Sequence, residues 1–323
     1  MRAALSTTAR RAFAAAAAGG AVAAATHATT MSEPRGNSLQ FEAIKAFRSK
    51  LQAGAVPLVG IGIQLADPTS SDALADSSDF LWFDQEHTPL SPEMIKWHTM
   101  VAHGRGCPVI VRVPGPNIVA GGARPWGTYI KHALDSNADG IVVPQVRTVD
   151  DVRSVVADCR YPRGGGRAPP YDVVQASDDP ALVRRGFGPT TPMNYGRIPI
   201  QKYIDMADES VFVGVMIETC EALAAIEDIC AVPGLDCVVI GANDLSAAMG
   251  VPYQGNAPNV QEAVDKIIDA AQRHGKYIMF STRDVSLAKR LAAKGVQILH
   301  VGSDVLAAVG FQTKLVADIK KSV

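Results

Sequence analysis

From residue 38 to the C-terminus, short apolar runs alternate with segments of helical periodicity, and eight such runs follow one another. Most of the runs show no polar–apolar alternation, which is typical of strands buried on both faces of a sheet. Strands that alternate with helices of this length form βαβ units and a parallel sheet. The expected strands are 57–65, 80–84, 108–113, 140–146, 211–217, 237–241, 277–281 and 296–302.

Eight such units predict an α/β fold of the (β/α)₈ TIM-barrel type, which typically occupies about 250 residues. An N-terminal helix is expected at 38–54, and an extra C-terminal helix at 304–320. A doubly wound open sheet is the alternative arrangement of the same units. No G-x-G-x-x-G follows the first expected strand, which disfavours a dinucleotide-binding sheet. The segment 160–210 is expected to be irregular.

The overall composition excludes several function classes. Hydrophobic residues make up 47% of the 323 residues, so the chain can bury a sizeable core. The formal net charge is −1 and no basic block occurs, which argues against a nucleic-acid partner. The five cysteines form no C-x-x-C pair, which argues against a disulfide framework and fits a reducing compartment. The apolar stretch 12–25 is too short and alanine-rich for a membrane span.

The first 30 residues differ from the rest, because they are basic, hydroxylated and alanine-rich and the first acidic residue is Glu33. This composition is typical of a mitochondrial transit peptide. The alternative is a disordered extension, with Met31 as the working start. Either interpretation separates an N-terminal extension, 1–36, from a single barrel domain, 37–323, and predicts a mitochondrial or cytoplasmic protein.

Ionisable side chains stand at the ends of several expected strands, where the active site of a barrel lies. They are Asp84 and His87 after the second strand, Arg112 in the third, Glu218 at the fifth and Asp244 after the sixth. Because parallel strands end at the same rim, we expect these side chains to converge at one mouth. Lys276 precedes the seventh strand, so no lysine stands at a strand end as a Schiff-base nucleophile.

Arg112 lies within a run of β-branched residues. A guanidinium stays charged, and burying it without a partner is costly, so Arg112 requires an anion nearby. One interpretation is a structural ion pair with a neighbouring carboxylate. The other is a binding group for a substrate oxyanion or keto oxygen.

Glu218 and Asp244 are 26 residues apart but end neighbouring strands, so their carboxylates are expected to converge. Two oxygen ligands with open positions suit Mg²⁺ or Mn²⁺, and such a site also accepts Co²⁺ or Zn²⁺. The structural alternative is a first-turn helix acid at Glu218 and an N-cap at Asp244. Together with Arg112, the two acids favour the interpretation as a metal site over the structural alternative.

Asp84 and His87 are three residues apart at a strand end. A carboxylate beside an imidazole fixes its tautomer and raises its basicity, so the two form a candidate acid–base pair. Glu86 lies between them and is expected to cap or steady the loop. The remaining histidines, including His300, are interpreted as structural.

Several motifs taken together resemble the HpcH/HpaI aldolase family. They are Phe83-Asp84-x-Glu86-His87-x-Pro89, Val111-Arg112-Val113-Pro114, Ile217-Glu218-Thr219, Gly241-Ala242-Asn243-Asp244-Leu245-Ser246, Trp126-x-x-x-Ile130-Lys131-x-x-Leu134-Asp135 and Gly302-Ser303-Asp304. Each motif is weak alone, but their combination and order are specific. The resemblance covers about residues 40–320.

The resemblance implies a class II, metal-dependent aldolase that cleaves 4-hydroxy-2-oxo acids to pyruvate and an aldehyde, or decarboxylates oxaloacetate-like acids. It implies that Glu218 and Asp244 hold the metal and that Arg112 binds the keto oxygen and steadies the enolate. It also implies a homo-oligomer, commonly a hexamer built from dimers that exchange their last helix.

The same resemblance assigns the remaining site residues. His87 and Asp84 would form the acid–base dyad. Backbone N–H groups of Ala242, Asn243 and Asp244 would bind the pyruvate carboxylate.

The chain departs from the family after Tyr161-Pro162-Arg163-Gly164, where a Pro/Asp-rich segment precedes Arg184-Arg185-Gly186-Phe187-Gly188. Omitting 165–183 restores the family pattern, so we interpret these residues as an insertion, for example an untranslated intron read through in the gene model. The alternative is a long loop over the active site. Long structureless loops inside a compact domain are uncommon.

Two other functions are compatible with these residues. An acyl-CoA ester lyase of the malyl-CoA or citryl-CoA type also uses an arginine, a glutamate and an aspartate at a barrel mouth. Asp84 and His87 favour the aldolase. The second alternative is an inactive product, in which 165–183 disrupts the site.

Overall fold

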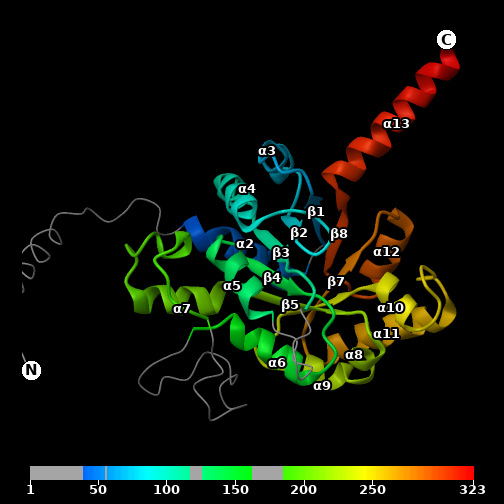
Figure 1. The fold of residues 1–323 in the computed structure, drawn as a ribbon. Coiled ribbons are helices and arrows are strands. Elements are labelled where there is room, and N and C mark those ends of the chain that lie inside the picture. The colour runs from blue at the N-terminus through cyan, green and yellow to red at the C-terminus, as the bar shows by residue number, and fades with distance from the viewer. Residues whose placement is uncertain (1–38, 55–56, 117–125, 162–184) are drawn as a thin grey trace, which may run out of the picture. The chain divides into compact units, whose positions relative to one another are not determined.

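The computed structural model describes residues 39–54, 57–116, 126–161 and 185–323 (Figure 1). Contacts divide the chain into Met1–Asn37 and Ser38–Val323, and every described residue belongs to the second unit. The expectations for 1–36 and for the insertion 165–183 lie outside the described residues. Within the described ranges, no helix is both long and apolar enough to cross a membrane.

Eight parallel strands close into a barrel in chain order, with β8 paired to β1, as the sequence predicted. The open-sheet alternative is therefore wrong. The strands are β1 (Leu58–Ile63), β2 (Phe80–Asp84), β3 (Val109–Arg112), β4 (Gly140–Val143), β5 (Phe212–Ile217), β6 (Cys237–Ile240), β7 (Tyr277–Ser281) and β8 (Ile298–Ser303).

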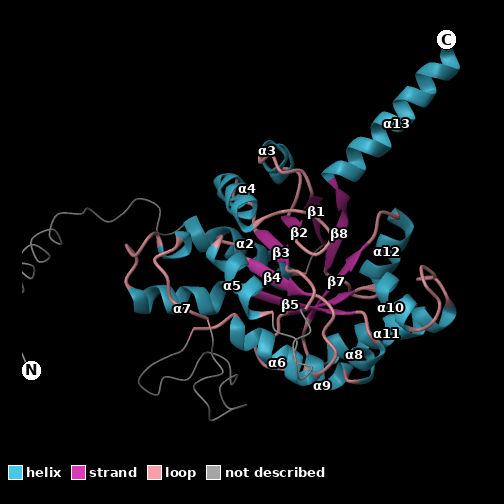
Figure 2. Cartoon of the chain, in the orientation of Figure 1, coloured by secondary structure: helices cyan, strands magenta, loops and turns pink. Residues whose placement is uncertain are grey.

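Helices surround the strands, as Figure 2 shows, and the expected N-terminal and C-terminal helices are present. They are α2 (Leu39–Ala53), α3 (Thr69–Ala75), α4 (Pro92–Gly104), α5 (Gly127–Asp135), α6 (Val149–Asp158), α7 (Ile200–Ser210), α8 (Cys220–Ala224), α9 (Ile226–Cys230), α10 (Ala242–Ala248), α11 (Pro258–Arg273), α12 (Val285–Ala293) and α13 (Asp304–Ser322).

Two differences from the sequence prediction concern helices. The segment expected to be irregular contains α7 and a short 3-10 helix, Thr191–Met193. The helix expected after β5 is interrupted at Ala225, which ends α8 and caps α9.

Side chains alternate between the inside and outside of the barrel. On β2, Phe80 and Trp82 belong to the buried cluster inside it, whereas Leu81 and Phe83 belong to the cluster that joins strands to helices. Phe47 of α2 packs edge-on against Phe80, at 5.7 Å between ring centroids, and equally against Phe212. Because Phe80 and Phe212 begin their strands, α2 closes the N-terminal end and leaves the C-terminal end for chemistry.

Candidate active site

Arg112 is held by two acids at the C-terminal ends of β2 and β3. The strand register places Asp84 directly opposite Arg112. Arg112 Nε donates to Asp84 Oδ1 at 2.9 Å, its Nη2 donates to Asp84 Oδ2, and its Nη1 lies 3.0 Å from Glu86 Oε2. Burial acts to raise the pKa of Asp84, but the hydrogen bonds and charge of Arg112 outweigh it and the pKa is lowered. The anion that Arg112 requires is therefore supplied by the chain.

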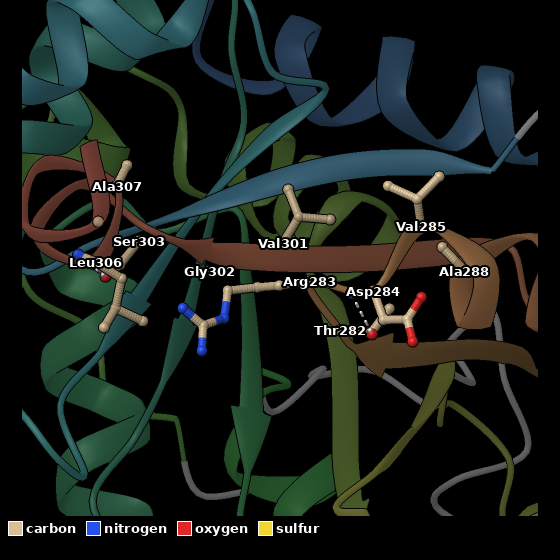
Figure 3. A pocket seen from close by; sticks show the side chains of 11 residues that line it. Thr282, Arg283, Asp284, Val285, Ala288, Val301, Gly302, Ser303, Leu306 and Ala307 are labelled. Atoms are coloured by element: carbon tan, nitrogen blue, oxygen red, sulfur yellow. Dashed lines mark hydrogen bonds between the residues drawn. The ribbon is translucent and has the colours of Figure 1, made fainter. Parts of the chain in front are cut away.

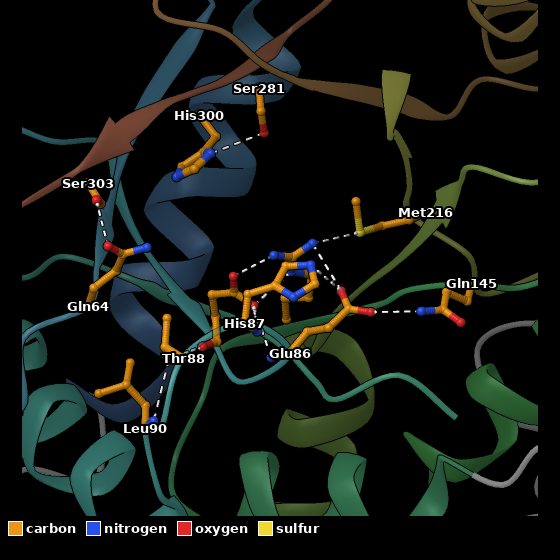
Figure 4. A network of polar contacts seen from close by, with 12 residues as sticks. Gln64, Glu86, His87, Thr88, Leu90, Gln145, Met216, Ser281, His300 and Ser303 are labelled. Atoms are coloured by element: carbon orange, nitrogen blue, oxygen red, sulfur yellow. Dashed lines mark hydrogen bonds and ion pairs between the residues drawn. The ribbon is translucent and has the colours of Figure 1, made fainter. Parts of the chain in front are cut away.

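The Asp84 carboxylate contacts His87 through the backbone. Asp84 Oδ1 accepts the N–H of Glu86 at 2.9 Å and the N–H of His87 at 3.3 Å. The His87 side chain is 65% exposed, and its Nε2 lies 3.8 Å from Glu86 Oε2 (Figure 4). Direct pairing of the ring with Asp84 is thus not observed, because the strand register commits that carboxylate to Arg112.

Glu218 directly follows β5 and is buried, with 5% of its surface exposed. Its Oε1 accepts the backbone N–H of Gln145 at 2.8 Å, and Gln145 Nε2 donates to Glu86 Oε1 at 3.1 Å. Burial, followed by the charges of Glu86 and Asp244, raises the pKa of Glu218 to about 7. The charge of Asp244, in the segment after β6, is among the causes of this shift. The convergence of the two carboxylates on one cation stays a prediction.

Asp244 lies in the first turn of α10 and is exposed. The N-cap is Gly241, so the alternative that Asp244 is an N-cap is wrong. A Cβ added at Gly241 would lie 2.8 Å from Glu218 Oε2 and 2.9 Å from Glu218 Cβ. Only glycine therefore lets the turn before α10 approach Glu218 this closely. Ala242, Asn243 and Asp244 are the first three residues of α10, whose N–H groups have no acceptor within the helix.

The donor set fits a divalent cation held by few protein ligands. Among the described residues, no group of three or more His, Cys, Asp and Glu side chains is placed to hold a metal ion. Mg²⁺ commonly uses one or two carboxylates and completes its shell with water and substrate. Glu218 and Asp244 match that pattern, and a cation beside them would offset the charge that raises the pKa of Glu218.

A cavity of about 110 Å³ adjoins the Asp84–Arg112 pair on the side of β1 and β8. Its polar lining includes Gln64, Ser303 and His300, none of which was predicted as a site residue from the sequence. Gln64 Oε1 accepts from Ser303 Oγ at 3.1 Å, and His300 Nδ1 contacts Ser281 Oγ at 3.0 Å (Figure 4).

His300 is neutral at neutral pH, because burial and the charge of Arg112 lower its pKa to about 4. Its ring lies 5.4 Å from that of Trp82. His300 lines the same cavity as Arg112, a position that its interpretation as a structural residue did not include. The sequence did contain a signal for the position of His300, because side chains two residues apart on a strand face the same side. Ile298, two residues before His300, belongs to the cluster inside the barrel.

This combination of a closed barrel and an acid-rich, arginine-containing mouth agrees with the comparisons to known proteins. The sequence model of the HpcH/HpaI aldolase/citrate lyase family matches residues 65–309. The chain belongs to this family, which confirms the resemblance.

Three individual proteins are similar to this chain. The chain is 32% identical over 263 residues to 4-hydroxy-2-oxovalerate aldolase of Rhodococcus jostii, covering 81% of this chain and 90% of that one. It is 31% identical to 4-hydroxy-2-oxo-heptane-1,7-dioate aldolase of Salmonella typhimurium, covering 80% and 88%. The crystal structure of an HpcH/HpaI aldolase from Desulfitobacterium hafniense superposes with a TM-score of 0.71 at 27% identity, covering 84% and 96%.

Proposed function

We propose that this chain is a metal-dependent lyase that cleaves 4-hydroxy-2-oxo acids to pyruvate and an aldehyde. The observation that carries the proposal is the buried Glu218 carboxylate, whose pKa is raised to about 7 beside Glu86 and Asp244 at the barrel mouth. The two curated relatives act on 4-hydroxy-2-oxo acids by name, which supports the same substrate class here.

In this proposal Glu218 and Asp244 hold a divalent cation, Mg²⁺ or Mn²⁺, with Co²⁺ and Zn²⁺ as chemically acceptable substitutes. When bound, the cation acts as a Lewis acid toward the 2-oxo oxygen, where negative charge develops as the bond breaks. Gln145 donates its backbone N–H to Glu218 Oε1 and thereby orients the carboxylate.

Arg112 binds the keto oxygen and stabilises the enolate charge. A positioned cation of this kind contributes on the order of a few kcal/mol to a transition state. Asp84 and Glu86 hold the guanidinium in place, so little reorganisation is required when the substrate binds. The N–H groups of Ala242, Asn243 and Asp244 bind the pyruvate carboxylate.

His87 moves the proton of the C4 hydroxyl. Its ring stands exposed at the mouth, where it can reach a substrate, and the Asp84 carboxylate fixes the loop that carries it. Asp84 thus serves the acid–base pair by positioning the His87 backbone and Arg112.

The experiment is a pyruvate-release assay on a 4-hydroxy-2-oxo acid and, in parallel, on oxaloacetate. We expect release that EDTA abolishes and added Mg²⁺ or Mn²⁺ restores. Cleavage of malyl-CoA or citryl-CoA without pyruvate release would instead identify an acyl-CoA lyase. If the full chain is inactive and a variant lacking 165–183 is active, the insertion is inhibitory; if neither is active, the proposed function is wrong.

We also propose that the protein is a homo-oligomer, with a hexamer as the expected form. Every residue of α13 from Leu306 onward is exposed. The exposed apolar side chains are Leu306, Val309, Phe311, Leu315, Val316 and Ile319. A helix this apolar gains stability by packing against a partner, and a second copy offers the matching surface.

For location, we propose mitochondria if residues 1–36 are a transit peptide and the cytoplasm if they are not. Imaging the full chain with a C-terminal fluorescent tag distinguishes the two. A variant that begins at Met31 serves as the control.

A further inference from the structure

Gln145 follows β4 by two residues and contacts two of the acids at the barrel mouth. Its backbone N–H donates to Glu218 Oε1 at 2.8 Å, and its side-chain Nε2 donates to Glu86 Oε1 at 3.1 Å (Figure 4). The other oxygen of Glu86 lies 3.0 Å from Arg112 Nη1. One residue therefore joins a proposed metal ligand to the acid that holds Arg112.

These contacts lie on the side of the mouth that β2, β3, β4 and β5 form. Near β7 and β8, the mouth instead contains a cavity of about 510 Å³ (Figure 3). Leu306, Ala307 and Gly310 of α13 line that cavity, and in the proposed oligomer a second copy packs on this helix. The hydrogen bonds from Gln145 to Glu218 and Glu86 involve no residue of α13, so covering this helix leaves them in place.

The backbone of Gln145 is held in a left-handed conformation, with a φ of +56°. This conformation is unfavourable for a residue with a Cβ, and glycine or asparagine adopts it more readily. Rotation about φ turns the peptide plane that carries the Gln145 N–H relative to the residues that follow. A relaxed φ would therefore move the N–H away from Glu218 or displace the chain after Gln145. The strained conformation is thus required for the hydrogen bond to Glu218.

The side-chain amide of Gln145 holds this conformation in place. Glu86 accepts its hydrogen bond, and Glu86 is itself fixed by Arg112. Gly115, three residues after β3, leaves room for the bond, because a Cβ there would lie 3.1 Å from Gln145 Nε2 and 3.2 Å from Glu86 Oε1. The bond between the amide and the carboxylate therefore offsets part of the cost of the left-handed backbone.

The hydrogen bond from Gln145 also distinguishes the two oxygens of Glu218. Oε1 accepts the N–H, whereas Oε2 faces the turn before α10, where a Cβ at Gly241 would lie 2.8 Å from it. Asp244 follows three residues later, in the first turn of α10. The oxygen directed at the segment that carries the second proposed ligand is thus the one that Gln145 leaves unoccupied. Hydrogen bonds that orient metal ligands typically change metal affinity by about 10- to 100-fold.

We propose that Gln145 is a positioning residue for the metal. Its side chain, anchored on Glu86, holds the left-handed backbone whose N–H orients the Glu218 carboxylate. The inference rests on the proposed function, in which Glu218 and Asp244 hold a divalent cation. In this role Gln145 acts through Glu218, so its loss lowers the affinity for the metal.

The test measures Mn²⁺ binding to the full-length protein by electron paramagnetic resonance, which reports free Mn²⁺ without turnover. Gln145→Ala lacks the amide but keeps a Cβ. It should bind Mn²⁺ about 5- to 30-fold more weakly than the wild type, the ratio that corresponds to the cost of one left-handed residue. Gln145→Gly also lacks the amide but adopts a positive φ readily, so it should bind Mn²⁺ more tightly than the alanine variant.

Two further variants complete the test. Gln201→Ala removes an exposed amide–carboxylate hydrogen bond on α7, from Gln201 Nε2 to Asp205 Oδ1 at 3.2 Å, and should keep the wild-type affinity. Gln145→Asn, which also tolerates the left-handed conformation, replaces the glycine variant in the comparison if urea unfolding shows that the glycine variant is unstable.

A purely structural role predicts a different order, because glycine loses more conformational entropy on folding than alanine and should then bind Mn²⁺ no better. If Gln145→Ala binds like the wild type, or no more weakly than Gln145→Gly, the role of Gln145 is wrong and the proposed function stands. If the wild type binds no Mn²⁺, both are wrong. If the binding order is as expected but no pyruvate is released, the role of Gln145 stands and the proposed substrate class is wrong.

Discussion

At the end of β5, the Glu218 carboxylate is buried, and the charges of Glu86 and Asp244 further oppose its ionisation. We expect Glu218→Gln to abolish metal-dependent pyruvate release, because it removes an anionic ligand. The same change removes a charge that burial disfavours, so the free energy of unfolding should be unchanged or increased. Pyruvate assays and urea unfolding of the two proteins test both parts. Retained activity would contradict the metal assignment, and a large loss of stability would contradict the conclusion that burial disfavours the charge.

His87 is expected to transfer a proton, although its ring is exposed and lies nearest to Glu86. Removing a general acid–base group typically lowers kcat by about 10²- to 10⁴-fold. We therefore expect a loss of this size in His87→Ala, measured at saturating substrate and metal. His132→Ala, an exposed change on α5, is the matched control and should keep full activity. A loss below tenfold in His87→Ala would exclude His87 from the mechanism.

At the scale of elements, a buried pair links α4 to the segments that begin β3 and β4. His103 Nε2 lies 2.6 Å from Asp139 Oδ2, which also accepts the Val109 N–H at 2.8 Å. Burial acts to lower the pKa of His103, but the charge and hydrogen bond of Asp139 outweigh it and the pKa is raised above 6.5. A raised pKa means that this stabilisation is complete below pH 6.5 and decreases as the pH rises through the folded-state value.

We expect His103→Gln to lower the free energy of unfolding by about 1.5–3 kcal/mol at pH 6, the usual contribution of a charged hydrogen bond. The difference between wild type and variant should shrink by pH 8.5. Urea unfolding at both pH values measures it, and the comparison cancels the other titrating groups. If the difference in unfolding free energy between wild type and variant grows with pH, the conclusion that the pKa of His103 is raised is wrong.

At the scale of the whole molecule, α13 offers an apolar surface that the described part of its own chain does not cover. Phe311 is 67% exposed on this helix. We expect Phe311→Asp to convert the oligomer to smaller species, because a charge in an apolar interface is costly to bury. Light scattering after size-exclusion chromatography measures the mass. Lys320→Asp, at the exposed end of α13, should leave the mass unchanged, and a monomeric wild type would contradict the proposal.

The local sequence pattern was sufficient to predict most of the strands and helices of the barrel. Strands buried on both faces are continuously apolar, so the boundaries of β2 and β7 were predicted to the residue. The helix α7 was missed although its sequence has helical periodicity, since the buried Tyr203, Ile204 and Ala207 lie on one face of the helix. Tyr203 packs against Phe41 of α2, at 6.4 Å between ring centroids, so this face is covered by a tertiary contact.

The sequence was sufficient to predict that Asp84, Arg112, Glu218 and Asp244 lie at one rim of the barrel. The reason is that all parallel strands of a barrel run in the same direction, so the residues at their C-terminal ends lie at the same rim. Contacts that depend on register and closure required the tertiary structure. The alignment of β2 with β3 commits Asp84 to Arg112. Pairing of β8 with β1 places His300 and Gln64 in the same cavity as Arg112, and these residues are far apart in the chain. A sequence pattern indicates the periodicity and the direction of each strand. The distances between side chains across a closed barrel are set only when all eight strands pair.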